Sequence, residues 1–141
     1  MFDFKFDWCK EMEGGVELID EQHQSLFRIG RDMEQLIMSG CQNASTQQLL
    51  DIVCELRDYV AYHFYAEEGL MQQYDYPNLA EHKKVHDIFK RRVLLIDPPT
   101  LGKYPEKILP KLKDDLQDFV FKHMLIEDRN LCKYLNTCGL S

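Results

Sequence analysis

The chain has 141 residues, of which 45% are hydrophobic, and its formal net charge is −7 at pH 7. This length suits one domain with a buried core, over residues 1–141. The acidic balance argues against nucleic acid, whose phosphates attract basic patches. No apolar stretch reaches the roughly 20 residues of a membrane span or suggests a signal peptide. We therefore expect a cytoplasmic protein that binds neither nucleic acid nor membrane.

Residues 1–17 are expected to form an arm that precedes the first helix. Aromatic and charged residues alternate in this segment, which ends at Gly14-Gly15. Its four aromatic residues are Phe2, Phe4, Phe6 and Trp8. Four aromatic residues within so short a stretch predict that the arm packs on the body of the protein, because such side chains gain most from burial.

Apolar residues at helical spacing predict a first helix from about Asp20 to Ser39, which Gly40 ends. Its expected inner face consists of Leu18, Leu26, Phe27, Ile29, Met33, Leu36 and Ile37. A second helix should begin after an N-cap at Ser45 or Thr46. It should run to about Tyr74, with an inner face formed by Leu49, Ile52, Val53, Leu56, Val60, His63, Phe64, Glu67, Leu70 and Met71.

The third helix is predicted from Leu79 to about Leu95, after a break at Tyr76-Pro77. Asn78 opens the sequence N-L-A-E, which is typical of a capping box with Glu81 at the third helical position. Its expected inner face consists of His82, Val85, His86, Phe89, Val93 and Leu94.

Asp97-Pro98-Pro99 should end the third helix and lead into a loop over residues 100–104. A fourth helix should begin between Pro105 and Pro110, since proline fits the first turn or a kink, and end near Leu135. No alternation typical of β-strands follows the arm. We therefore predict an all-α, antiparallel up-down-up-down four-helix bundle over residues 18–135.

All five histidines lie at positions suited to metal ligation: His23, His63, His82, His86 and His123. Residues four apart share a helix face, so His63 with Glu67, and His82 with His86, each direct two ligands to one place. Imidazole binds first-row transition metals, and carboxylates bridge two ions. Five inward histidines and several carboxylates would be costly to bury without a metal. These side chains offer more ligands than one metal ion can bind, and they therefore predict a two-metal centre inside the bundle.

The order H … H-x-x-x-E … H-x-x-x-H … H-x-x-x-x-D resembles the signature of the hemerythrin family. The segment I-D-E-Q-H-Q-S-L-F around His23 resembles the first-helix motif of that family. The segment H-F-Y-A-E-E and the aromatic arm with its tryptophan match as well. The resemblance covers about residues 6–135 and is strongest to the single-domain bacterial hemerythrins.

This resemblance implies two iron ions joined by an oxo or hydroxo bridge. One iron would be held by three histidines and the other by two, with two bridging carboxylates between them. In this chain the implied ligands are His82, His86 and His123 for one iron, His23 and His63 for the other, and Glu67 and Asp128 as bridges. The first iron then has six ligands and the second five. The open position suits end-on binding of a small diatomic molecule.

Two acidic residues compete for the second bridge. On a regular helix Glu127 shares a face with His123, whereas Asp128 lies about 140° away. Helical spacing therefore selects Glu127, while the resemblance selects Asp128, which we follow. A flanking approach of Asp128 or a local π-type widening of the helix would reconcile the two. Glu68, which follows Glu67, is expected beside the site or in solvent.

The histidine-rich ligand set differs from the carboxylate-rich sites of ferritin-like oxidases. With fewer anionic ligands, the site should bind dioxygen reversibly, for carriage, storage or sensing, and not act as an enzyme. The expected apolar pocket consists of Leu26, Phe64, Phe119, Val120 and Met124. The alternative is a di-iron enzyme or sensor that acts on peroxide or nitric oxide, and zinc is a weaker alternative to iron. The sequence does not identify a protein partner.

Overall fold

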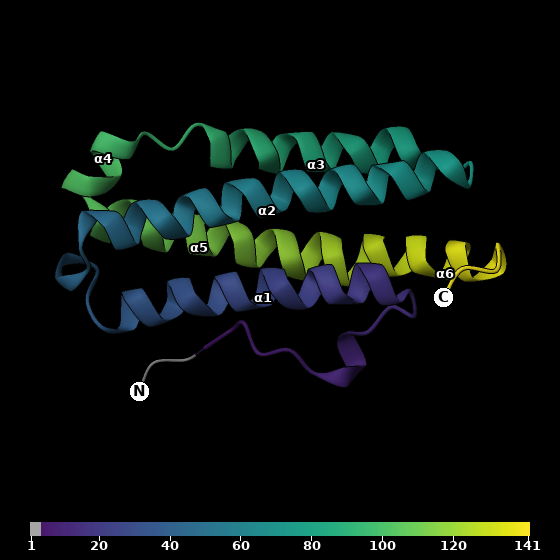
Figure 1. Cartoon of the computed structure of the whole chain (residues 1–141), viewed down its shortest axis with the longest axis horizontal. Coiled ribbons are helices and arrows are strands. Elements are labelled where there is room, and N and C mark those ends of the chain that lie inside the picture. The colour runs from purple at the N-terminus through teal and green to yellow at the C-terminus, as the bar shows by residue number, and fades with distance from the viewer. Residues whose placement is uncertain (1–3) are drawn as a thin grey trace.

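The computed structural model describes residues 4–141, so Phe2 of the arm lies outside the described part. Four long helical segments lie side by side and alternate in direction (Figure 1), which confirms the predicted all-α bundle. They are α1 (Glu17–Met38), α2 (Thr46–Gln73), α3 (Leu79–Leu94) and a fourth segment made of α5 (Pro105–Phe119), the π-helix η3 (Val120–Asp128) and α6 (Arg129–Thr137). Residues 4–141 contain no strand.

No helix among the described residues has the length and apolar character needed to cross a membrane.

Short 3₁₀-helices lie in the arm, at η1 (Lys10–Met12), and between α1 and α2, at η2 (Cys41–Asn43). The start of α2 is capped as the sequence predicts. Ser45 Oγ accepts the backbone N–H of Gln48 at 3.1 Å, and Gln48 Oε1 accepts the N–H of Ser45 at 2.8 Å. The capping box predicted for α3 is wrong. The Asn78 side chain makes no capping hydrogen bond because its backbone leaves the extended region that such a cap requires.

The loop predicted after the third helix is wrong as well, because Pro98–Lys103 form the short helix α4. Asp97 caps this helix by accepting the N–H of Thr100 at 3.2 Å and its hydroxyl at 2.6 Å. Proline at the first helical position suits the fixed φ angle of that residue. Leu101 is fully buried and anchors the turn to the bundle. The next helix, α5, begins at Pro105, so Pro110 lies inside it.

The core consists of two apolar clusters. The large apolar cluster consists of Phe6, Leu26, Phe27, Ile29, Met33, Cys41, Leu49, Ile52, Val53, Leu56, Val60, Phe64, Phe89, Val93, Leu101, Leu109, Leu112, Leu116, Phe119, Val120 and Met124. The small apolar cluster, near the other end of the bundle, consists of Val16, Ile19, Met71, Leu131, Cys132 and Leu135.

Three residues predicted to face inward are exposed instead. Leu18 is 43% exposed, Val85 38% and Leu94 50%. On α1 the neighbouring Ile19 is buried in place of Leu18. On α3 only a narrow stripe faces the bundle, and Val85 and Leu94 lie to either side of it.

The first half of the arm is fixed to α1. Phe6 is buried over Gly30, where an added Cβ would lie 2.5 Å from the Phe6 ring, so the close approach requires glycine. The buried Glu34 accepts the backbone N–H of Phe6 at 2.8 Å. Trp8 meets Phe27 edge to face, with 5.2 Å between ring centroids. The predicted packing of the arm is therefore confirmed for its described residues.

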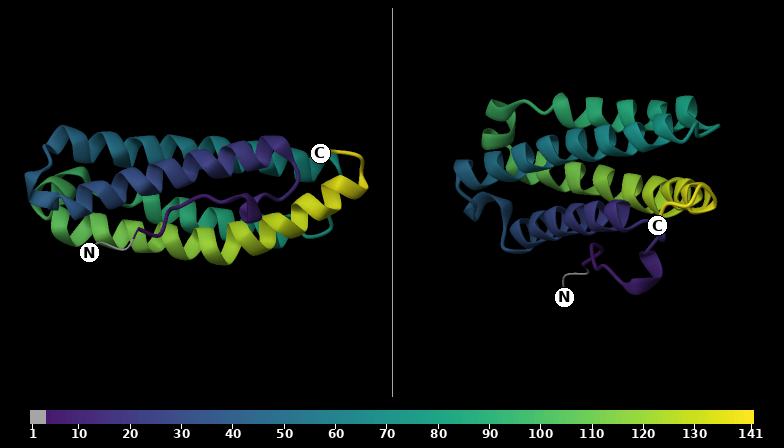
Figure 2. Two further views of the ribbon diagram at one scale, coloured as in Figure 1. Left: turned by 90° about the horizontal axis from the view of Figure 1, so that it is seen from below. Right: turned by 45° about the vertical axis from the view of Figure 1, so that its right-hand side comes forward.

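The second half of the arm is fixed to the end of the chain. Arg129 Nη2 donates to the carbonyl oxygen of Glu11 at 2.6 Å, and Asn136 Nδ2 donates to that of Gly15 at 3.0 Å. Asp20 accepts the N–H of Gly15 at 3.1 Å. The arm therefore runs along the outside of the bundle and joins its first helix to its last (Figure 2).

Candidate metal centre

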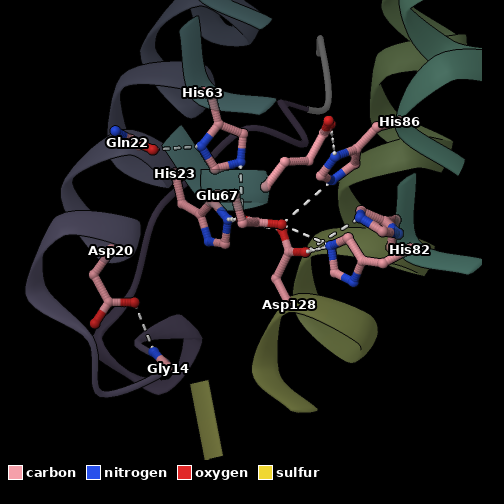
Figure 3. Close-up of polar contacts among 11 residues, drawn as sticks. Gly14, Asp20, Gln22, His23, His63, Glu67, His82, His86 and Asp128 are labelled. Carbon is pink, nitrogen blue, oxygen red and sulfur yellow. Dashed lines mark hydrogen bonds and ion pairs between the residues drawn. The ribbon is translucent and has the colours of Figure 1, made fainter. Parts of the chain in front are cut away.

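The structure brings all seven predicted ligands together inside the bundle, between residues of the two apolar clusters. Figure 3 shows the side chains of His23, His63, Glu67, His82, His86 and Asp128 gathered at this place. Each of these side chains belongs to a residue that is at most 5% exposed. We call this set the polar layer: His23 of α1, His63 and Glu67 of α2, His82 and His86 of α3, and His123 and Asp128 of η3. Every long segment of the bundle contributes at least one of these residues.

The ligand atoms of the polar layer form two groups, within each of which they lie within 4.8 Å of one another. We call them the three-histidine group and the two-histidine group. The three-histidine group contains His82, His86, His123, Glu67 and Asp128. The two-histidine group contains His23, His63, Glu67 and Asp128. Both carboxylates belong to both groups, which is the division that the family resemblance implies.

Glu67 directs one oxygen to each group. Its Oε1 lies 2.7 Å from His82 Nε2 and 3.3 Å from His86 Nε2. Its Oε2 lies 3.3 Å from His63 Nε2. The carboxylate therefore lies between the groups in the orientation that a bridge requires.

The Asp128 carboxylate also directs one oxygen to each group. Its Oδ1 lies 2.8 Å from His82 Nε2 and 3.1 Å from His123 Nε2, both in the three-histidine group. Its Oδ2 lies 2.9 Å from His23 Nε2 in the two-histidine group. Two carboxylates from two helices thus span the same pair of positions.

Several buried atoms of the polar layer lack a hydrogen-bond partner among the described residues. They are His63 Nε2, Glu67 Oε2, His86 Nε2, His123 Nδ1 and Nε2, and Asp128 Oδ1. Unpaired buried polar atoms are costly, and a cation that accepts their lone pairs would remove that cost. Neighbouring ligands on an octahedral ion lie about 3 Å apart if each bond is about 2.1 Å. The short distances within the two groups agree with that spacing, so these residues fit bound metal.

Burial and neighbouring charges affect the protonation of these residues in opposite directions. Burial, partly offset by Glu67, lowers the pKa of His63 to about 4. Burial also opposes protonation of His82, but hydrogen bonds to Asp128 and Glu67 outweigh it and raise the pKa to about 10. Burial opposes ionisation of Asp128, yet the surrounding histidines hold the pKa of its carboxyl well below the usual value. A proton at His82 therefore competes with any metal, because ligands bind in their deprotonated form.

The π-helix η3 explains how Asp128 reaches the polar layer. A π-helix forms hydrogen bonds between residues five apart, so residues at that spacing share a face. His123 and Asp128 have this spacing, and η3 spans both. Asp128 is fully buried, whereas Glu127 is exposed. The spacing rule for regular helices, which favours Glu127, does not apply here because the helix is widened.

Two further residues contact the histidines from outside the polar layer. His63 Nδ1 lies 2.7 Å from the Oε1 of the buried Gln22, and His86 Nδ1 lies 2.9 Å from Glu68 Oε2. Sequence reasoning placed Glu68 either beside the site or in solvent, and it missed Gln22. The only sequence signal for Gln22 is its place beside His23 on the first helix.

The five residues predicted to line an apolar pocket are all buried in the large apolar cluster. Phe64 stacks on His86 with ring centroids 4.0 Å apart, and Phe119 stacks on His123 at 4.8 Å. Their role toward a bound molecule stays a prediction. A surface hollow of about 350 Å³ lies next to the polar layer and is lined by Asn78, Glu81, His82, Val85, Lys122, His123 and Glu127.

Residues 14–135 match the model of the hemerythrin HHE cation binding domain. The bacteriohemerythrin of Clostridium acetobutylicum is 28% identical over 124 residues, which cover 88% of this chain and 96% of that protein. A bacteriohemerythrin of Campylobacter jejuni is 30% identical over 120 residues, which cover 84% of this chain and 86% of that protein. One of Pseudomonas aeruginosa is 28% identical over 121 residues, with coverage of 86% and 75%. With this match across the bundle and its buried polar layer, the chain belongs to the hemerythrin family.

Proposed function

We propose that this protein is a non-haem di-iron protein that binds dioxygen reversibly. The observation that carries the proposal is the pair of ligand groups that share both carboxylates, one with three histidines and the other with two. Family membership supports iron as the metal. Residues 1–141 would form one domain, with the arm over residues 1–17 and the bundle over residues 18–135.

In this proposal each residue of the polar layer has a defined role. His82, His86 and His123 would hold the iron in the three-histidine group, and His23 and His63 would hold the iron in the two-histidine group. Glu67 and Asp128 would be shared by both irons. When bound, the irons would supply the binding position and the electrons that reversible dioxygen binding requires.

The apolar residues around the polar layer would keep water away from the open position. Leu26 and Val120 are fully buried, and Met124 is 1% exposed. Phe64 and Phe119 fix the rings of His86 and His123 by stacking, which limits ligand movement. A site closed in this way favours release of the bound molecule over its reaction with a second substrate. We therefore propose a binding protein that is not an enzyme, and the expected cytoplasmic location stays a prediction.

Metal analysis and absorption spectra test this proposal. Freshly isolated protein should contain about two irons per chain, as the number of ligands implies. The reduced protein should be nearly colourless without oxygen, gain a visible absorption band in oxygen, and lose the band when oxygen is removed. Zinc alone after growth with ample iron would contradict the proposed metal. Immediate irreversible oxidation would instead support an enzyme or sensor that acts on peroxide or nitric oxide.

A further inference from the structure

The two ligand groups differ in the partner that orients one histidine of each. In the two-histidine group, His63 Nδ1 faces the amide oxygen of Gln22 at 2.7 Å. In the three-histidine group, His86 Nδ1 faces a carboxylate oxygen of Glu68 at 2.9 Å. One partner is neutral and the other is anionic, although both lie on the outer side of a buried imidazole ring.

The Glu68 contact fixes which nitrogen of His86 carries the proton. An ionised carboxylate only accepts hydrogen bonds, so His86 Nδ1 must donate. The lone pair of His86 is then at Nε2, which lies 3.3 Å from Glu67 Oε1 and has no hydrogen-bond partner. With Nδ1 committed to Glu68, Nε2 is the atom of the ring that is left to ligate a metal.

The negative charge of Glu68 also makes His86 Nε2 a stronger ligand for a metal ion. A carboxylate that accepts the N–H of a ligating histidine raises the basicity of the ring and fixes its orientation. Burial strengthens this interaction, because the His86 side chain is fully buried and that of Glu68 is only 24% exposed. The Gln22 amide orients His63 without adding a negative charge.

We propose that Glu68 is a positioning residue that fixes the His86 tautomer and lowers the reduction potential of the iron in the three-histidine group relative to the other iron. This inference rests on the proposed di-iron function. Each iron takes up one electron between its ferric and ferrous states. A stronger donor ligand stabilises the ferric state, so the two irons should be reduced at separate potentials.

Three variants of the iron-loaded protein test the inference. Glu68→Gln keeps an oxygen that accepts the His86 N–H but removes the charge. Glu68→Leu removes both the accepting oxygen and the charge. The matched control is Glu127→Gln. Glu127 is adjacent to the proposed bridge Asp128, as Glu68 is adjacent to the proposed bridge Glu67, yet it makes no hydrogen bond to a histidine within residues 4–141.

Potentiometric titration, followed by the electron paramagnetic resonance signal of the mixed-valence state, gives both midpoint potentials. Glu68→Gln should keep two irons and raise mainly the lower midpoint, which narrows the potential range of the mixed-valence signal. Glu127→Gln should leave that range unchanged. Glu68→Leu should bind iron about 10–100-fold more weakly in competition with a chelator, as is typical when the partner of a ligating histidine is lost.

The thermal midpoint of the iron-free variants separates positioning from a structural role. It should match that of the wild type in Glu68→Gln and Glu127→Gln, which keep an acceptor at each position, and a lower midpoint for Glu68→Gln would overturn the inference. Equal shifts of potential in Glu68→Gln and Glu127→Gln, or no shift in either, would also overturn it. Weaker iron binding by Glu68→Leu but not by Glu68→Gln, with the shift of the lower midpoint confined to the Glu68 variants, would support it. A wild-type protein without iron would refute the proposed function itself, whereas iron with unaltered midpoints in the variants would refute only the role of Glu68.

Discussion

The large apolar cluster and the polar layer both draw on the same four helical segments. They differ in the interactions that they offer to their buried atoms. In the cluster, aromatic and aliphatic side chains fill the space between helices, as where Phe89 stacks on Phe119 with centroids 4.4 Å apart. In the polar layer, six buried nitrogen and oxygen atoms have no hydrogen-bond partner among the described residues. The side chains of the cluster fill it by themselves, whereas in the proposed function bound cations would complete the layer. We therefore expect a change in each region to affect different properties.

The largest effect should come from Asp128→Ala. This change removes a proposed bridge between the two ligand groups and leaves His23 and His123 without their acidic partner. We expect the loss of at least one iron and of about 3–5 kcal/mol of stability, as when one partner of a buried ionic contact is removed. Iron analysis and thermal unfolding measure both effects. A variant that keeps two irons and wild-type stability would show that the layer does not depend on this bridge.

Leu116→Ala should affect the apolar cluster alone. Leu116 is fully buried, and truncation of a buried leucine to alanine typically costs about 2–5 kcal/mol because it leaves a cavity. Chemical denaturation of the iron-loaded variant measures this loss. The iron content should stay at the wild-type value, and a fall in iron content would mean that the cluster and the layer are not independent.

Removal of iron should loosen the polar layer more than the cluster, and two buried cysteines report on this difference. Cys132 lies one turn beyond Asp128, and burial raises the pKa of its thiol to about 12. Cys41 belongs to the large apolar cluster, and burial raises the pKa of its thiol as well. Both should therefore react with iodoacetamide only through local opening, since the thiolate is the reactive form.

Mass spectrometry of the labelled protein compares the two thiols. Removal of iron should accelerate the labelling of Cys132 several-fold more than that of Cys41. The exposed Cys9, Cys54 and Cys138 provide the control, because they should react quickly in both forms. Equal acceleration of the two buried thiols would indicate that the whole bundle loosens without metal.

The smallest effect should come from Glu127→Ala. Glu127 is exposed and precedes Asp128, so its removal takes away only a peripheral charge. We expect two retained irons and a change in stability within about ±0.5 kcal/mol, as for ordinary surface substitutions. The variant should be measured beside Asp128→Ala. If Glu127→Ala loses iron and Asp128→Ala does not, the choice of bridge is wrong.

The sequence predicts the bundle well because apolar spacing reports directly on which helix face is buried. It fails at α4 and at Asn78, where a short capped turn and a backbone angle decide the local structure. The polar layer is predictable because histidine pairs four residues apart on regular helices reveal it. The π-helix cannot be predicted from the spacing of residues, since Asp128 could be preferred to Glu127 only through the family resemblance. Gln22 was missed because a neutral amide beside a ligand has no distinctive pattern.

The attachment of the arm has a consequence for the order of folding. The contact between Phe6 and Glu34 joins residues 28 positions apart, whereas that between Glu11 and Arg129 joins residues 118 positions apart. Contacts between distant residues close long loops and form late unless other structure has already brought them together. The second half of the arm can dock only after α6 lies beside α1. This segment precedes the whole bundle in the chain, yet it would be among the last to reach its final position.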